Sequence, residues 1–273
     1  MSDYKFTELG KETSYSQSYD PRLLCPIARV TARHSQSEVN LNFKGVDLWT
    51  AYELSWLNLD GLPQVAIAEF MVPCDSESII ESKSFKLYLN SFIQTSFANM
   101  ESVQHQLVKD LSSAAGAMIE VILYEIAEYQ GMQPISEPQG NCIDRQPTVI
   151  NSYDPDASLL QAKSATLVEE TLYSHLLKTN CPVTNQPDWA SIYVFYKGPK
   201  IDPEGLLKYI VSYRNHQDFH EQCVEQIFLD ITAACSPSQL SVYARYMRRG
   251  GLDINPFRST HLLRPPLFRQ VRQ

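Results

Sequence analysis

The sequence predicts an α+β protein with antiparallel sheets, helices on one face of each sheet, and two copies of one folding unit along the chain. Three observations support this fold class. Stretches that alternate apolar and polar residues occur in pairs joined by short turns, which is typical of antiparallel hairpins. Segments with an apolar stripe at helical spacing follow these pairs. The G-x-G-x-x-G motif of a doubly wound parallel sheet does not occur in the chain.

In the first half, residues 1 to about 42 are rich in Ser, Tyr, Asn and charge, and we expect an extended arm or irregular cover. Residues 46–71 alternate on either side of the turn 58–63 and predict a long hairpin. Residues 79–92 follow as a β-prone stretch.

Residues 99–112 then carry Val103, Leu107 and Leu111 at helical spacing, which predicts a helix. Residues 117–128 indicate a strand, although a helix is also compatible with this stretch.

Residues 130–160 are rich in Pro, Asn and Gly and predict a connection between two modules, 1–145 and 146–273. After this connection the order of elements repeats. The expected elements are strands at 167–177 and 191–196, a β-prone segment at 206–213, a helix at 217–234 and a final strand at 240–246.

Composition narrows the possible functions. The net charge of −8 and the pI of about 5.3 argue against a nucleic-acid partner. No apolar run approaches the roughly 18 residues that a membrane span needs, and the first residues lack the layout of a signal peptide. The six cysteines are scattered without a C-x-x-C pair, so we expect neither a zinc ribbon nor a disulfide framework, and a reduced cytoplasmic location.

The loop 179–188 holds a cysteine, Cys181, and a carboxylate, Asp188, on a backbone restricted by Pro182 and Pro187. A thiol beside a proton-carrying acid suits covalent attack on an electrophilic carbon. The loop alone leaves a second interpretation open, a buried structural cysteine beside a turn aspartate.

Three further motifs have a structural and a functional interpretation. Glu81-Ser82-Lys83 can be a solvated surface, and Arg248-Arg249-Gly250-Gly251 a basic turn. Phe219-His220-Glu221 can be a polar pair near a helix start. It is not a zinc H-E-x-x-H motif, because Val224 occupies the place of the second histidine.

Four strings in order resemble a known family. The chain is similar to the NADPH-dependent nitrile reductases of queuosine biosynthesis, the 7-cyano-7-deazaguanine reductases, in their long two-module form. The resemblance covers nearly the whole chain, with no departure at a motif position. The matching strings are ESKSFKLYLNSF from Glu81, NCPVTNQPDW from Asn180, FHE from Phe219 and RRGGLDINP from Arg248.

The resemblance implies a reaction and its residues. Cys181 would attack the nitrile to form a covalent thioimide, and Asp188 would supply protons. Two NADPH molecules would each deliver a hydride. The implied substrate-binding residues are Ile80, Glu81, Ser82, His220 and Glu221. The implied NADPH-binding residues are Ser82, Lys83, Arg249 and Gly250, and no metal site is implied.

In this family, Glu221 would pair with the N–H edge of the guanine-like base, while His220 would bond the substrate or assist proton transfer. The implied fold is a tandem tunnelling fold (T-fold) whose sheets close into a barrel through oligomerisation, with a homodimer expected. The substrate would be the free base 7-cyano-7-deazaguanine, with no direct nucleic-acid or membrane contact.

Two other functions stay open at this point. A related cyclohydrolase or pterin synthase would need His and Cys clusters spaced for a metal, and no such spacing occurs here. A non-catalytic purine-binding module would retain its function after loss of Cys181.

Overall fold

The computed structural model describes residues 16, 18–33, 43–132, 135–136 and 139–273, and its chain divides into two compact units. Unit 1 consists of Met1–Val39, Asp47–Pro134 and Arg248–Asp253. Unit 2 consists of Asn40–Val46, Ile135–Met247 and Ile254–Gln273. The greater part of the predicted arm, residues 1–15, 17 and 34–42, lies outside the described residues.

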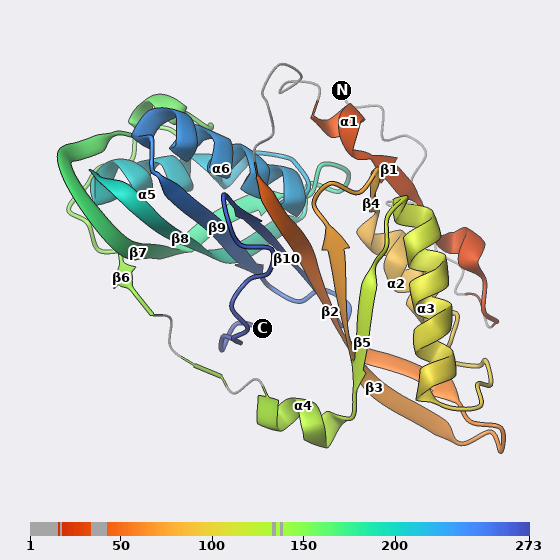
Figure 1. The fold of residues 1–273 in the computed structure, drawn as a ribbon. Helices are drawn as coiled ribbons and strands as arrows, with labels where there is room; N and C mark the ends of the chain where they lie inside the picture. The colour runs from red at the N-terminus through yellow and green to blue at the C-terminus, as the bar shows by residue number, and fades with distance from the viewer. Residues whose placement is uncertain (1–15, 17, 34–42, 133–134, 137–138) are drawn as a thin grey trace. The chain divides into compact units, whose positions relative to one another are not determined.

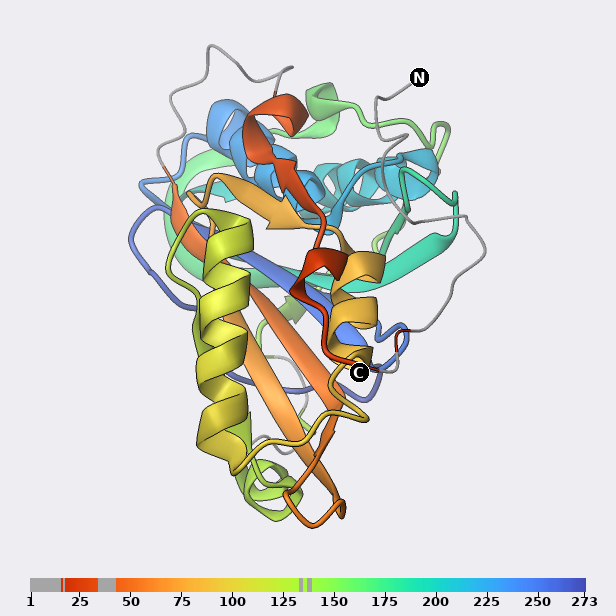
Figure 2. The ribbon, with the colours of Figure 1, turned by 90° about the vertical axis from the view of Figure 1, so that its right-hand side faces the viewer.

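Unit 1 contains a three-stranded antiparallel sheet in the order β5-β3-β2, a small two-stranded sheet, and helices (Figures 1 and 2). None of the helices in the described part of the chain is long and apolar enough to cross a membrane. The elements are a 3-10 helix Pro21–Leu23, β1 Pro26–Ala28, α1 Arg29–Ala32, β2 Lys44–Leu57, β3 Pro63–Pro73, β4 Ser78–Ile80, α2 Ser82–Asn90, α3 Met100–Ala115, β5 Glu120–Tyr124 and α4 Ile126–Met132.

The predicted hairpin and the predicted helix of unit 1 are both confirmed, as β2–β3 and as α3. Helix α2 presents Phe85 to the sheet, with its ring centroid 5.1 Å from that of Trp49 on β2 and 5.0 Å from that of Phe70 on β3. Helices α2 and α3 therefore both contribute fully buried apolar side chains to the core of unit 1. Burial of apolar side chains is the main source of stability in a small α+β core.

The interpretation of residues 79–92 as a β-prone stretch is wrong, because residues 82–90 form helix α2. The Glu81 carboxylate caps this helix, accepting from the backbone N–H groups of Lys83 and Ser84 at 2.8 Å each. A cap satisfies amide donors that a helix start would otherwise leave unpaired. The local cap and the buried face therefore outweigh the β-propensity of the aromatic residues.

Residues 117–128 also differ from the single strand expected. The strand β5 covers only 120–124, pairs with β3, and gives way to α4 from Ile126. Helix α4 returns Tyr129 to the sheet, where its hydroxyl donates to Glu69 at 3.1 Å.

Unit 2 contains strands in the order β10-β9-β8-β7-β6, all antiparallel except the short β6–β7 pair. Figure 1 shows α5 and α6 together on one face of these strands. The elements are β6 Asn141–Cys142, a 3-10 helix Ala157–Leu159, β7 Ala162–Asn180, β8 Pro187–Ile201, α5 Pro203–Ser212, a 3-10 helix Tyr213–Asn215, α6 His220–Cys235, β9 Gln239–Tyr246 and β10 Leu252–Ser259.

The segment 206–213 likewise lies in a helix, α5, with the 3-10 turn that follows it, and not in a β-prone segment. Asp202 caps α5 and Pro203 occupies its first turn, which favours helix initiation. The predicted helix at 217–234 is confirmed as α6, which begins at His220.

The predicted strand at 240–246 is confirmed as β9. It is not the final strand, because β10 follows it and pairs with it, Phe257 opposite Tyr243. The sequence of β10 contains Asn255 and Pro256, which are poor strand formers. A prediction based on strand propensity therefore misses β10.

Alternate residues of β8 and β9 face α5 and α6 and form the main core of unit 2. These side chains are Ala190, Ile192, Val194, Tyr196, Leu240, Val242, Ala244 and Tyr246. The intervening residues, including Tyr193 and Tyr243, form a separate aromatic cluster on the opposite face. This alternation decides which side chains can meet the start of α6.

Candidate active site

The predicted site residues are divided between the two units. Unit 2 holds Cys181, Asp188, His220 and Glu221, and unit 1 holds Ile80, Glu81, Ser82, Lys83, Arg249 and Gly250.

The Cys181 loop joins β7 to β8 and is held by its own backbone. Cys181 donates its N–H to Gln186 at 2.9 Å, and its carbonyl accepts from Asn185 at 3.0 Å. Asn185 has φ +57°, a left-handed conformation that asparagine tolerates better than most residues. Cys181 is only 9% exposed, so its thiol lies at the edge of the core.

The same loop is tied to the chain that leads into α6. The backbone of Asn180 donates to His216 at 2.8 Å and accepts from Asp218 at 3.2 Å. Helix α6 begins two residues after Asp218, so the cysteine loop and the start of α6 are parts of one hydrogen-bonded structure.

Asp188 stands on β8 directly opposite Thr179 of β7. Its carboxylate is 3% exposed, and Oδ2 lies 3.4 Å from Nε2 of His220, the first residue of α6. A buried carboxylate next to an imidazole makes a pair that can hold and move one proton. The structure therefore brings together two residues that lie 32 positions apart in the sequence.

A bulge in β7 sets the face on which Thr179, the residue opposite Asp188, lies. Between Ser174 and Leu177, β7 advances by three residues while β8 advances by two. Leu172 and Leu177 both pack under the helices although they are five residues apart, an odd spacing that a regular strand would place on opposite faces. Thr179 consequently shares the helix-covered face with Leu177.

Glu221 follows His220 in the first turn of α6 and is 3% exposed. The N-terminus of a helix carries a partial positive charge that favours nearby carboxylates. The residue before the helix, Phe219, is apolar and supplies no side-chain cap. The start of α6 is therefore an environment in which carboxylates such as Asp188 and Glu221 are stabilised.

The pKa of the Cys223 thiol is raised well above its usual value, first by burial and then by the charges of Asp218, Glu221 and Asp188. Cys223 therefore stays a neutral thiol, buried inside α6. Burial and Arg214 lower the pKa of Lys178, while Asp188 raises it. Lys178 thus interacts electrostatically with Asp188, which the alternation of residues along the strands did not predict.

In unit 1, Glu81 is the N-cap of α2, and its carboxylate is 1% exposed. The two backbone N–H groups of the cap each bond to a different oxygen of this carboxylate. An ionised carboxylate offers about four acceptor positions, so the Glu81 carboxylate can accept from a further donor. The described part of the arm reaches this motif. Cys25 accepts the N–H of Glu81 at 2.9 Å, and β1 pairs with β4 through Pro26 and Ile80.

Arg249 and Gly250 lie in a tight turn of the same unit. Arg249 exchanges backbone hydrogen bonds with Leu252, and Gly250 has φ +61°. A Cβ atom at Gly250 would lie 3.2 Å from Cδ of Lys86, a residue of α2. The glycine therefore keeps the turn close to the basic side chains of α2. A lysine side chain beside an exposed glycine backbone suits a phosphate-bearing ligand.

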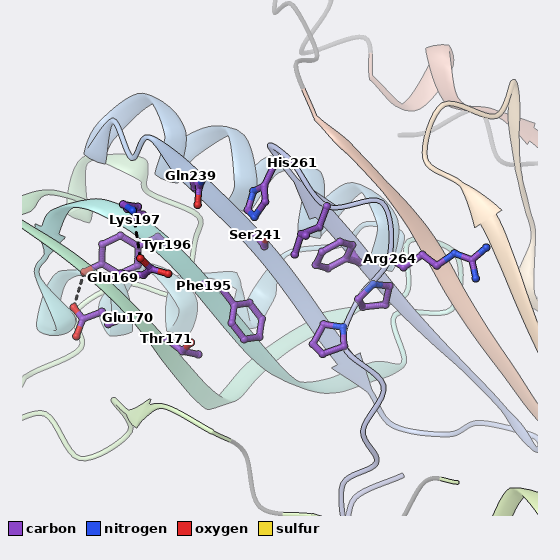
Figure 3. Close-up of a pocket in the computed structure, with 14 residues that line it drawn as sticks. Glu169, Glu170, Thr171, Phe195, Tyr196, Lys197, Gln239, Ser241, His261 and Arg264 are labelled. Carbon is purple, nitrogen blue, oxygen red and sulfur yellow. Dashed lines mark hydrogen bonds and ion pairs between the residues drawn. The ribbon is translucent and has the colours of Figure 1, made fainter.

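A cavity of about 520 Å³ lies elsewhere in unit 2, on the face of β7, β8 and β9 opposite the helices (Figure 3). Its polar lining is already engaged in part, since Tyr196 donates to Glu170 at 2.6 Å and Lys197 lies 3.4 Å from Glu169. None of its lining residues is a predicted site residue. The described residues also contain no cluster of three or more His, Cys, Asp or Glu that could hold a metal ion.

Comparison with known proteins places two family matches on the chain. Residues 15–123 match the family described as nitrile reductase, 7-cyano-7-deazaguanine-reductase N-term, and residues 187–264 match QueF-like protein. The protein named NADPH-dependent 7-cyano-7-deazaguanine reductase from Paraburkholderia phytofirmans is 55% identical, with 97% of each chain covered. The protein of that name from Saccharophagus degradans is 52% identical, with 97% of this chain and 98% of its own length covered.

Among solved structures, an archaeosine synthase QueF-Like in the apo form matches 37% of this chain and 99% of its own, at 22% identity. The TM-score of 0.31 is too low for this likeness to carry an argument.

Proposed function

Since the chain belongs to the family of NADPH-dependent 7-cyano-7-deazaguanine reductases, we propose that it reduces the nitrile of 7-cyano-7-deazaguanine to the primary amine of 7-aminomethyl-7-deazaguanine. The free base would be reduced in the cytoplasm for queuosine modification of tRNA. The observation that carries the proposal is the joining of Asp188 to the start of α6 beside the Cys181 loop.

The first chemical step belongs to Cys181. Its sulfur adds to the nitrile carbon, the C≡N bond becomes C=N, and the nitrogen takes a proton, giving a thioimide. NADPH supplies a hydride to this carbon, and a proton completes the adduct. The C–S bond then breaks, releasing the thiol and leaving an imine, which a second hydride and proton convert to the amine. The overall reduction of the nitrile to the amine would consume two NADPH and two protons.

Asp188 and His220 supply the protons. Their contact at 3.4 Å allows one proton to be shared between carboxylate and imidazole. Burial of Asp188 strengthens this interaction, because charges in a low-dielectric site are poorly screened. The pair stands at the beginning of β8 and the beginning of α6, two elements of the core of unit 2, which keeps its geometry rigid.

Recognition of the base rests on carboxylates. Glu221 would accept two parallel N–H bonds from the guanine-like edge, the bidentate arrangement that carboxylates favour. Ile80, Glu81, Ser82 and His220 complete the proposed substrate-binding set. The spare acceptor capacity of Glu81 supports its place in this set.

NADPH fits the residues of unit 1. Ser82, Lys83, Arg249 and Gly250 would hold it, with the basic side chains paired to phosphate and the glycine allowing close approach of the backbone. The crowding of a Cβ at Gly250 against Lys86 supports this fit.

The proposed architecture is a tandem tunnelling fold with modules 1–145 and 146–273, whose sheets close into a barrel through self-association, as a homodimer. The same order of hairpin, two helices and strand in both units supports two modules of one kind.

The test is intact-protein mass spectrometry with the nitrile and without NADPH. We expect an adduct equal to the substrate mass on Cys181 in the wild-type protein. Cys181→Ala should bind the nitrile without forming an adduct and should lose turnover entirely. Cys142→Ala is the matched control, because Cys142 is an exposed thiol of the same unit. This variant should keep both adduct formation and turnover. A wild-type protein that stays unmodified at saturating nitrile contradicts the proposal.

A further inference from the structure

The side chain of His220 is held by an aromatic ring. Its imidazole lies parallel to the ring of Tyr246, with centroids 3.7 Å apart and an interplanar angle of 1°. We propose that Tyr246 is a positioning residue for the reaction, whose ring face keeps Nε2 of His220 directed at Asp188. This inference rests on the proposed function, because it gives the pair of His220 and Asp188 its geometry.

A histidine that exchanges protons is usually oriented by a hydrogen bond to its second ring nitrogen. Here Nε2 faces Asp188 at 3.4 Å. The other nitrogen, Nδ1, is buried and has no hydrogen-bond partner among the described residues. No such bond fixes the ring plane, so packing against Tyr246 must fix it.

The tyrosine is well placed for this task. Its N–H donates to Oδ1 of Asn255 at 3.1 Å, and its carbonyl accepts from Nε2 of Gln273 at 3.2 Å. On β9 it pairs with Ala190 of β8, and its side chain is fully buried. Burial raises the pKa of the Tyr246 phenol well above its usual value, so the ring stays neutral.

The stack has a consequence for the tautomer of His220. A neutral His220 that donates to Asp188 across this contact would carry its proton on Nε2 and leave Nδ1 bare. A half-turn of the imidazole would exchange the two nitrogens, and a close parallel ring opposes every tilted intermediate of that turn. The negative face of Tyr246 also attracts the ring while it carries a positive charge.

Three substitutions of Tyr246 distinguish the effect of its ring from the effect of its hydroxyl. Tyr246→Phe keeps the ring face, whereas Tyr246→Leu removes it. Tyr246→Met is a second ring-free variant in case the leucine variant fails to fold, because methionine fills irregular core space well. Tyr243→Leu is the matched control, since Tyr243 is a fully buried tyrosine on the opposite face of the same strand.

The first measurement is ¹⁵N NMR of histidine-labelled protein without nitrile or NADPH. His220→Asn identifies the His220 signals. Wild type and Tyr246→Phe should show a single Nε2–H tautomer for His220. Tyr246→Leu and Tyr246→Met should show averaging between tautomers, and Tyr243→Leu should match wild type. This measurement is independent of activity, so it tests the positioning role even if the nitrile proves not to be the substrate.

The second measurement is steady-state kinetics with the nitrile. The ring-free variants should lose about 10- to 100-fold in kcat with KM nearly unchanged, because a displaced proton donor slows the reaction more than binding. Tyr246→Phe should keep the kcat of the wild-type protein. An unchanged tautomer and kcat in a folded ring-free variant would overturn the proposal, and so would a loss in Tyr246→Phe as large as in Tyr246→Leu. A wild-type protein that forms no adduct with the nitrile contradicts the proposed function alone.

Discussion

Units 1 and 2 share a half-buried frame of hydrogen bonds and differ at the start of their longer helix. In unit 1, Asp110 of α3 accepts from Tyr88 of α2 at 2.7 Å and from Gln106 at 3.0 Å. In unit 2, Asp230 of α6 accepts from Tyr209 of α5 at 2.5 Å and from Gln226 at 2.7 Å. Both long helices contain 16 residues, and both end at a residue in the left-handed conformation.

The starts of these helices diverge. Helix α3 begins after Asn99, whose side chain accepts from the N–H of Ser102 at 2.8 Å. Helix α6 begins after the apolar Phe219, and His220 takes the position that Met100 has in α3. The comparison shows that the start of α3 is stabilised by a side-chain cap, whereas the start of α6 has no such cap and carries the His220 and Glu221 side chains of the proposed site.

The largest expected difference lies between the two hairpins, β7–β8 of unit 2 and β2–β3 of unit 1. Asp188→Asn should lower kcat by about 100- to 10,000-fold, because it removes the proton carrier next to His220. Asp60→Asn, in the β2–β3 turn of unit 1, should leave kcat unchanged, since Asp60 is exposed. Steady-state kinetics compare the two variants. An equal effect of both would show that the acid in unit 2 has no special role.

The second residue of each helix gives the next test. Glu221→Gln should weaken binding of the nitrile about 10- to 100-fold, because the amide loses a charge-assisted acceptor worth about 1.5–3 kcal/mol. Glu101→Gln changes the same position of α3, where the side chain is exposed, and should have no effect on binding. Isothermal titration with the nitrile measures both dissociation constants. Unchanged affinity in Glu221→Gln would contradict its proposed role in reading the base.

The shared frame predicts equal, purely structural effects. Asp110→Ala and Asp230→Ala each remove the carboxylate that accepts from a buried tyrosine hydroxyl, so each should lower the free energy of unfolding by about 1.5–3 kcal/mol. Urea unfolding followed by fluorescence measures the loss. If only one variant is destabilised, the two frames are not equivalent.

The smallest effect concerns the helix ends. Gly116 follows α3 at φ +68°, and Ser236 follows α6 at φ +47°. Ser236→Gly should stabilise unit 2 by up to about 1 kcal/mol, because glycine adopts this conformation without strain. Gly116→Ser should be destabilising by more than that, since its Cβ would lie 2.7 Å from the Glu77 carboxylate. Thermal unfolding of both variants provides the measurement, and a destabilised Ser236→Gly would contradict the strain argument.

The hairpin of unit 1, α3 and α6 could be predicted because their apolar periodicity matches a single structure. Helices α2 and α5 were missed because aromatic and aliphatic residues suit both strand and helix, and the capping carboxylates of Glu81 and Asp202 decided between them. Strand β10 was missed because pairing with β9 overrode the poor propensity of Asn255 and Pro256.

The sequence by itself determined which residue types are available for the chemistry, because a motif such as N-C-P-x-T-N-x-P-D places a thiol and an acid in one short loop. It did not determine on which face of the sheet they would lie. The strands settled that for the acid, because Asp188 has the same parity along β8 as Ala190 and Ile192 on the helix-covered face. In β7 the bulge between Ser174 and Leu177 brings Thr179, the residue opposite Asp188, to that face. The parallel stacking of His220 on Tyr246 is also tertiary, since packing of α6 on β9 alone brings these two rings together.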